Sequence, residues 1–120
     1  MTPYSYPYRL LCGASVNATV INNTPCYLDG IFVGSLNDAP IYIFVYDTAG
    51  LPNANSVPVA QFLIPANATP ANGAGSNISF LKGMQLVNGL ALRVTKDIAS
   101  TGTTALDASE VPITFLWSKD

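Results

Sequence analysis

Histidine is absent from this chain of 120 residues, and its absence removes several kinds of chemistry. A Ser-His-Asp or Cys-His nucleophile system needs an imidazole as its base, and a His-bearing zinc site needs one as a ligand. Two cysteines are too few for a tetrathiolate zinc site. The sequence also lacks the EF-hand, P-loop and G-x-G-x-x-G patterns. We therefore expect no cofactor and no metal site.

Charge is scarce: charged residues make up 10% of the chain, and the net charge is −2. The five basic residues are scattered along the sequence, whereas nucleic-acid binding needs a clustered basic patch. The same scatter argues against an anionic membrane as partner. No apolar stretch approaches the length of a membrane span, and the first residues lack the pattern of a signal peptide. We expect synthesis in the cytoplasm, with no nucleic acid or membrane as partner.

The acidic residues do not form a recognisable catalytic pattern. A glycosidase-like pair needs only two carboxylates, so the count alone leaves such a pair open. Five of the acidic residues fall at or near expected turns, where Asp bends and caps backbone. These are Asp29, Asp38, Asp47, Asp97 and Asp107. Their positions favour structural roles, so we expect no catalytic residue and no enzyme activity.

Cys12 and Cys26 are too few to form a disulfide framework, and they are not a CxxC pair. Two buried thiols in a reducing compartment are the favoured interpretation. The alternative is a disulfide between subunits or one formed after assembly.

Short stretches of alternating or continuous apolar residues, separated by turn residues, fill the chain. The strand-like stretches cover residues 12–20, 26–34, 41–47, 57–64, 78–87, 90–95 and 111–117. The only helical signal is one short turn at 107–110. The pattern predicts a single all-β domain at residues 10–120, a β-sandwich or jelly roll of about eight antiparallel strands.

Asn88-Gly89 is the preferred pair for a two-residue type I′ turn, which needs a positive φ at both positions. It predicts a β-hairpin between the two flanking strands. After the turn the residues alternate between two faces. We expect Leu90, Leu92 and Val94 to point into the core, and Ala91, Arg93 and Thr95 to point away from it.

Residues 1–9 are expected to form an extended N-terminal arm, because Pro3 and Pro7 restrict the backbone. Three tyrosines alternate onto one side of it: Tyr4, Tyr6 and Tyr8. These rings could anchor the arm on a neighbouring subunit, pack on their own domain, or stack on sugar rings. Termini also often fray. We favour the contact with a neighbouring subunit.

The stretch 41–47 is apolar on both faces. One face carries Ile41, Ile43 and Val45, and the other carries Tyr42, Phe44 and Tyr46. Such a strand is either covered on both sides or has its outer face in a subunit contact. We favour the subunit contact, because only one set can fill the core of a thin two-layer domain and the other would leave a large apolar patch in water. The pattern predicts a homo-oligomer, most simply a trimer, with the aromatic set at the contact.

Residues 26–117 resemble small virion proteins of tailed phages. The resemblance is carried by "YLDGI", by an apolar strand that ends in "YD", by "GMQLVNGLALRVT" and by the Thr-rich "TTALD", in this order. Such proteins are often capsid decoration (cement) proteins with jelly-roll-like folds that form trimers on capsids. The resemblance implies a location on the capsid surface of the virion, with the major capsid protein as partner.

A second interpretation places the protein at a tail or fibre, as a receptor- or carbohydrate-binding module. This module would use exposed tyrosines or Trp117. The number of copies in the virion distinguishes the two: decoration needs many copies and a tail position needs few.

Overall fold

The computed structural model describes residues 5–13, 15–35, 40–65, 74–106 and 111–120, with the backbone alone at 35, 74–78 and 80–82. The described residues form eight strands and no helix, which confirms the all-β prediction. The strands are β1 (Tyr6–Leu11), β2 (Thr19–Asn22), β3 (Cys26–Ser35), β4 (Ile41–Asp47), β5 (Ala60–Ile64), β6 (Ala74–Leu86), β7 (Leu90–Thr95) and β8 (Pro112–Lys119).

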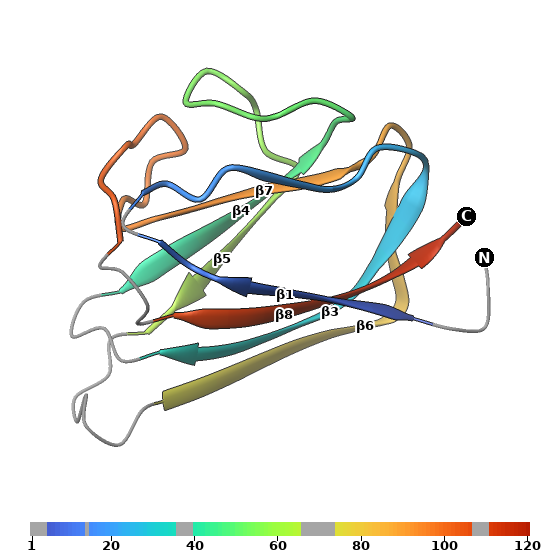
Figure 1. Cartoon of the computed structure of the whole chain (residues 1–120), viewed down its shortest axis with the longest axis horizontal. Helices are drawn as coiled ribbons and strands as arrows, with labels where there is room; N and C mark the ends of the chain where they lie inside the picture. Colours follow the sequence, from blue (N-terminus) through green and yellow to red (C-terminus); the bar gives the residue numbers. More distant parts are fainter. Residues whose placement is uncertain (1–4, 14, 36–39, 66–73, 107–110) are drawn as a thin grey trace.

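The strands lie in two four-stranded sheets that face each other (Figure 1). The first sheet has the order β1-β8-β3-β6 and the second has the order β2-β7-β4-β5. Among the residues that the structure describes, all pairings are antiparallel, and β4 and β5 are the only consecutive strands that pair. Every other connection crosses from one sheet to the other. This order is that of an eight-stranded jelly roll, so the predicted fold class is confirmed.

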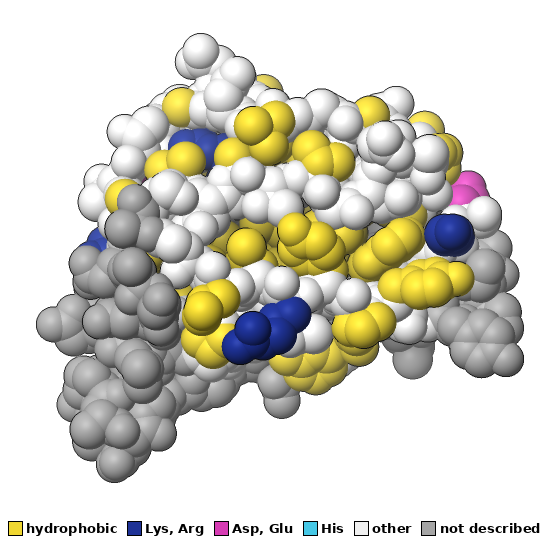
Figure 2. Space-filling model, in the orientation of Figure 1, with side chains coloured by type: hydrophobic (Ala, Val, Ile, Leu, Met, Phe, Trp, Pro, Cys, Tyr) yellow, Lys and Arg dark blue, Asp and Glu magenta, His cyan; other side chains and the backbone are white. Residues whose placement is uncertain are grey.

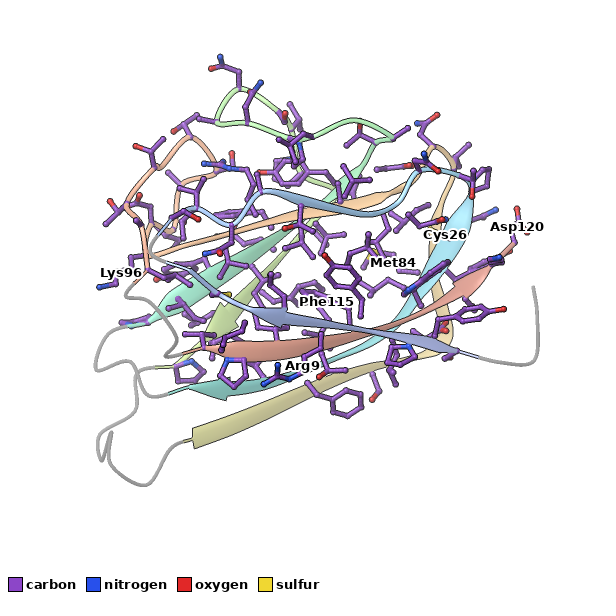
Figure 3. The ribbon with its side chains drawn as sticks, viewed as in Figure 1. Arg9, Cys26, Met84, Lys96, Phe115 and Asp120 are labelled. Carbon is purple, nitrogen blue, oxygen red and sulfur yellow. The ribbon has the colours of Figure 1, made fainter. Side chains whose placement is uncertain are left out.

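The core lies between the sheets and is filled by one face of each strand. Leu28, Ile31 and Phe115 enter it from the first sheet and Ile43 and Leu92 from the second, all with 0% exposure. Figure 3 shows Phe115 pointing between the sheets while Arg9 extends outward from β1. Fully burying one such side chain stabilises the fold by about 1.5–3 kcal/mol. Leu90, Leu92 and Val94 belong to this core, as predicted.

The predicted hairpin at Asn88-Gly89 is wrong. β6 pairs with β3 in the first sheet, whereas β7 pairs with β2 and β4 in the second, so residues 87–89 form a corner between sheets. Asn88 does not have the positive φ that a type I′ turn requires. The Asp47 carboxylate instead accepts hydrogen bonds from the backbone N–H of Val87 at 3.1 Å and of Asn88 at 2.7 Å.

The predicted strand at 12–20 is also wrong over most of its length, because β2 begins only at Thr19. Asn17 has a φ of 53° and bonds locally. Its side chain accepts from the Gly13 N–H at 2.8 Å and donates to the Ser15 carbonyl at 2.9 Å. These bonds give the backbone an alternative to a strand ladder, which an alternating sequence pattern does not reveal.

Two boundaries differ from the expectation. Residues 6–9, expected in an arm, are extended but pair with β8 from Tyr6 onward, so the sandwich begins before Arg9. Residues 74–77, expected in a loop, open β6. The predicted helical turn at 107–110 lies outside the described residues.

Candidate interaction surfaces

Tyr6 and Tyr8, expected on a neighbouring subunit, are engaged within this chain. Tyr8 is half-buried against the main core. Tyr6 is 39% exposed, and its ring centroid lies 5.1 Å from that of Trp117. The Lys119 ammonium lies 5.6 Å from the Tyr6 ring centroid, within cation–π range. These contacts correspond to the self-packing alternative. Tyr4 lies outside the described residues.

Tyr42, Phe44 and Tyr46, expected at an oligomer contact, lie on the outer face of the second sheet. Phe44 is 0% and Tyr46 1% exposed, and Tyr42 is half-buried beside them. The expectation of an open aromatic face is therefore wrong. Figure 1 shows two loops, 48–59 and 96–106, on the side of the second sheet that faces away from the first. The chain's own loops cover this face, so β4 is covered on both sides, which is the alternative that the sequence analysis did not favour.

Arg93 is buried beneath the second of these loops. It is 1% exposed and lies opposite Phe44 across β7 and β4. Its guanidinium donates to the carbonyl oxygens of Ser100 and Gly102, both at 2.8 Å, and lies 3.5 Å from the Tyr46 hydroxyl. Its Nε has no hydrogen-bond partner. This face of β7 points away from the main core, as expected, but it is not the exposed face of a strand with one buried face, because the cation anchors a loop over it.

Asp97 links two parts of the same loop through hydrogen bonds to Thr104. Its carboxylate accepts hydrogen bonds from the backbone N–H of Thr104 at 2.8 Å and from the Thr104 hydroxyl at 2.9 Å. The backbone bond from Thr104, with the hydroxyl bond added to it, lowers the pKa of Asp97 below its ordinary value. Arg93 and Asp97 together hold residues 96–106 against the second sheet.

The carboxylates of Asp29, Asp47 and Asp97 accept hydrogen bonds from nearby hydroxyl or backbone groups. Asp29 accepts from the Ser5 hydroxyl at 2.6 Å and from the Ser118 hydroxyl at 3.3 Å. Asp47 holds the corner at 87–89, and Asp97 holds the loop at Thr104. Asp47 and Asp97 thus have the turn and capping roles expected from their positions. Asp29, expected at or near a turn, lies instead within β3, at the register shift between Leu28 and Gly30. Within the described part of the chain, no group of three His, Cys, Asp or Glu side chains is placed to hold a metal ion.

Both cysteines are free thiols with 0% exposure, which confirms the favoured interpretation of two buried thiols. Burial raises the pKa of Cys12 to about 12. The pKa of Cys26 is also raised, chiefly by burial. Neither thiol is therefore poised for reaction in the folded chain.

The outer face of the first sheet is apolar and partly exposed, and we call it the first-sheet face. Leu11 is 46% and Phe32 38% exposed, and Leu116 is half-buried on the same side. Arg9 is exposed among them. Figure 2 shows apolar side chains gathered along the side where β1 lies, with few charged groups between them. Its exposure makes it a candidate contact surface.

A second apolar group, which we call the loop patch, lies on loops 48–59 and 96–106 and on β5. Its members are Leu51 (66% exposed), Val57 (86%), Val59 (55%), Leu63 (55%) and Ile98 (69%). Val59 immediately precedes β5, and its N–H donates to the Val45 carbonyl at 2.8 Å, one position away from the register in which Val45 pairs with Ala60. The Gln61 amide of β5 donates to the Ile98 carbonyl at 2.6 Å. The sequence analysis did not recognise this surface, although Val57 and Val59 flank a proline in an otherwise polar loop.

None of the described residues forms a helix that could cross a membrane.

No protein-family model and no curated protein matches this chain. Among solved structures, the coat protein of tobacco streak virus aligns over 99% of this chain and 88% of its own, at 13% identity and a TM-score of 0.38. A structure of the same coat protein as a dimer aligns over the same shares at 13% identity and a TM-score of 0.37. Because both TM-scores are below 0.5, we draw no conclusion from these alignments. The assignment of a jelly roll rests on the strand order of this chain alone.

Proposed function

We propose that this chain is a structural virion protein of a tailed phage, a capsid decoration (cement) protein that bridges neighbouring subunits of the major capsid protein. The observation that carries the proposal is the first-sheet face. It is a regular four-stranded surface with exposed Leu11 and Phe32 and the exposed cation Arg9. An exposed apolar sheet face of this kind suits docking on another folded protein.

The fold agrees with this proposal without deciding it. Eight-stranded jelly rolls include viral capsid domains and also lectins, so the fold alone does not determine the function. The ordered resemblance of residues 26–117 to small phage virion proteins supports the capsid role. In the described residues, the Asp47 and Asp97 carboxylates accept hydrogen bonds that hold a corner and a loop, and the Asp29 carboxylate of β3 accepts one from the Ser118 hydroxyl of β8.

The proposed mechanism is additive clamping. Each copy buries apolar side chains of the first-sheet face against the capsid, at about 25 cal/mol per Å² before the costs of association. Arg9 offers a guanidinium that can form paired hydrogen bonds with a carboxylate on the partner. Copies that are linked to one another bind together, so weak single contacts are multiplied by avidity.

The alternative, a carbohydrate-binding module at a tail or fibre, would use the exposed aromatic rings. Of the candidates expected from the sequence, Tyr6 is exposed and Trp117 is half-buried against the core, and their rings contact each other. Lys119 lies over the Tyr6 ring. These contacts occupy ring surface on which a sugar would have to stack, so the observations favour the protein contact.

The proposal is tested by adding purified protein to undecorated heads and measuring occupancy at limiting concentration. Phe32→Lys and Arg9→Glu should each lower occupancy severalfold without changing the melting temperature, because both side chains are exposed. Val87→Lys is the matched control, since Val87 is 62% exposed at the corner between sheets and away from the first-sheet face. Equal occupancy for all three variants would contradict the proposal.

The arm is tested in the same assay. Since β1 begins at Tyr6, deletion of residues 1–4 leaves the β1–β8 pairing intact, whereas deletion of residues 1–8 removes half of β1. If Tyr4 contacts the capsid, the shorter deletion should lower occupancy with an unchanged melting temperature. Unchanged occupancy would assign binding to the first-sheet face alone.

A further inference from the structure

We propose that residues 96–105, which we call the lid, open away from the second sheet while the sandwich stays folded, and that opening uncovers the buried cation Arg93. The lid follows β7 and ends before Leu106, which is 2% exposed and belongs to the main core. Every residue of the lid is exposed or half-buried. The lid therefore places no side chain of its own in a core, which is typical of segments that open locally.

The lid is closed on itself at its base. The Lys96 N–H donates to the Thr104 carbonyl at 3.1 Å, and the Asp97 carboxylate accepts from the Thr104 N–H and hydroxyl. Further along, the Gly102 N–H donates to the Ala99 carbonyl at 2.9 Å. These bonds lie inside the lid, so they stay intact when it moves. Compact loops whose ends lie close together form such units, and the lid can therefore move as one body.

The lid is attached to the second sheet through its backbone carbonyl oxygens. Arg93 of β7 donates to the Ser100 and Gly102 carbonyl oxygens at 2.8 Å each. Gln61 of β5 donates to the Ile98 carbonyl at 2.6 Å. When the lid opens, water replaces each of these partners, so the net stabilisation from each bond is much smaller than its strength in isolation. Few such attachments are broken on opening, compared with the whole core on unfolding.

The closed lid leaves the Arg93 guanidinium incompletely compensated. Arg93 is 1% exposed, its recorded partners are neutral oxygens, and its Nε has no hydrogen-bond partner. The buried Tyr46 hydroxyl lies 3.5 Å from the guanidinium, which is too long for a strong hydrogen bond. Taking a cation out of water is costly, and an incomplete set of partners offsets only part of this cost.

This cost is recovered in part when the lid opens, because the guanidinium and the Tyr46 hydroxyl then bind water. Exposure of ring surface on Tyr46 and on Phe44, which pairs with Arg93 across β4 and β7, opposes opening. The closed lid is therefore the major state, and the open lid is a minor state that requires less free energy than unfolding.

Opening changes what the second sheet presents to its surroundings. The uncovered guanidinium carries five N–H donors, and the ring of Tyr46 lies beside it. Arg and Tyr are among the residue types most enriched at contact hot spots. The closed lid withholds both side chains from contact, and the open lid makes them accessible.

The test uses the unmodified full chain, because its two arginines and its buried thiols report on different events. Butanedione in borate modifies arginine, and peptide mass spectrometry gives separate rates for the exposed Arg9 and for Arg93. A thiol reagent on a parallel sample gives the rate for Cys12, which is 0% exposed in the main core and reports unfolding of the sandwich. Each rate is divided by the rate at the same residue in the urea-unfolded chain.

The divided rate at Arg93 should lie below that at Arg9 and at least tenfold above that at Cys12. Equal divided rates at Arg93 and Cys12 would overturn the inference, because Arg93 would then become accessible only when the whole sandwich unfolds.

A variant that removes one attachment tests the lid directly. Gln61→Ala should raise the divided rate at Arg93 severalfold and leave the rate at Cys12 unchanged, because Gln61 is exposed and bonds to the lid. Gln85→Ala is the matched control, since Gln85 is an exposed glutamine on β6 of the first sheet, and should change neither rate. An equal rise at Arg93 and Cys12 with Gln61→Ala, or no rise at Arg93, would contradict a lid that opens by itself.

Discussion

Replacing Arg93 with methionine tests whether a buried cation holds the loop 96–106 over the second sheet. The guanidinium donates to the Ser100 and Gly102 carbonyl oxygens at 2.8 Å each, and its Nε has no partner. Methionine keeps much of the apolar stem and removes the charge together with every donor. The substitution therefore isolates the polar contribution of this side chain.

The magnitude follows from the groups that gain or lose a partner. Two carbonyl oxygens lose their donor, at about 1–3 kcal/mol each. Removing the unpartnered Nε relieves one buried polar group and returns about 1–3 kcal/mol. The bond to Tyr46, at 3.5 Å, is too long to count for much. The net expectation is a loss of about 1–3 kcal/mol, which in a chain of this length lowers the melting temperature by roughly 4–12 °C.

The assay is urea unfolding followed by circular dichroism, with amide hydrogen exchange to locate the change. Exchange should accelerate in residues 96–106 before the rest of the sandwich. Arg9→Met is the control, since Arg9 is exposed, and should change stability by no more than about 0.5 kcal/mol. Equal or greater stability of Arg93→Met would refute the reasoning, because it would mean that desolvation of an uncompensated charge outweighs its bonds to the loop.

Three further predictions concern other parts of the fold. Gly89→Ala should destabilise the chain by about 1–3 kcal/mol in urea unfolding, because the added Cβ would meet the Asn22 and Thr48 carbonyl oxygens at 2.7 Å. The control Gly50→Ala should be neutral, because its Cβ would meet only a side-chain oxygen, at 3.9 Å. The pKa of Asp97 is lowered in the folded state, so its contribution to the free energy of unfolding is present above its unfolded pKa and is lost as the pH falls through the folded pKa. Asp97→Asn should therefore reduce the loss of stability at acid pH, and an unchanged loss would contradict this. Burial raises the pKa of Cys12 to about 12, so at pH 8 an aromatic disulfide reagent should react with Cys12 only at the rate of unfolding. Fast labelling of Cys12 in the native chain would contradict its burial.

Some of the fold could be predicted because the local pattern and the tertiary structure agree. The apolar run at 41–47 matches β4 exactly in its bounds. The alternation of Ile113 and Phe115 with Thr114 sets the inner and outer faces of β8. In both cases, burial of one face dictates the sequence and can be read back from it.

The errors arise where a local signal has more than one tertiary solution. Asn88-Gly89 marks a reversal of the chain, but it does not say whether the two strands pair or enter different sheets. The N–H groups of the corner are accepted by Asp47, which lies 40 residues before Val87 and which a local pattern does not include. Asn17 breaks the expected strand through bonds to its own neighbourhood.

The candidate contact surfaces could be predicted only in part. The second apolar face of β4 correctly indicated that something covers it. Sequence periodicity does not show that the cover is the chain's own loops, because loops 48–59 and 96–106 have no regular pattern. Arg93 is the one signal that was available, since a basic residue in an otherwise apolar strand needs acceptors, which here are carbonyl oxygens of the loop above it.

A cryo-EM reconstruction of virions that carry this protein bears on the proposed capsid role more strongly than any other measurement. The proposal predicts many symmetry-related copies on the head, each with the first-sheet face, including Phe32 and Arg9, against the major capsid protein. A few copies at the tail, or copies on the head whose first-sheet face points into solvent, would contradict it.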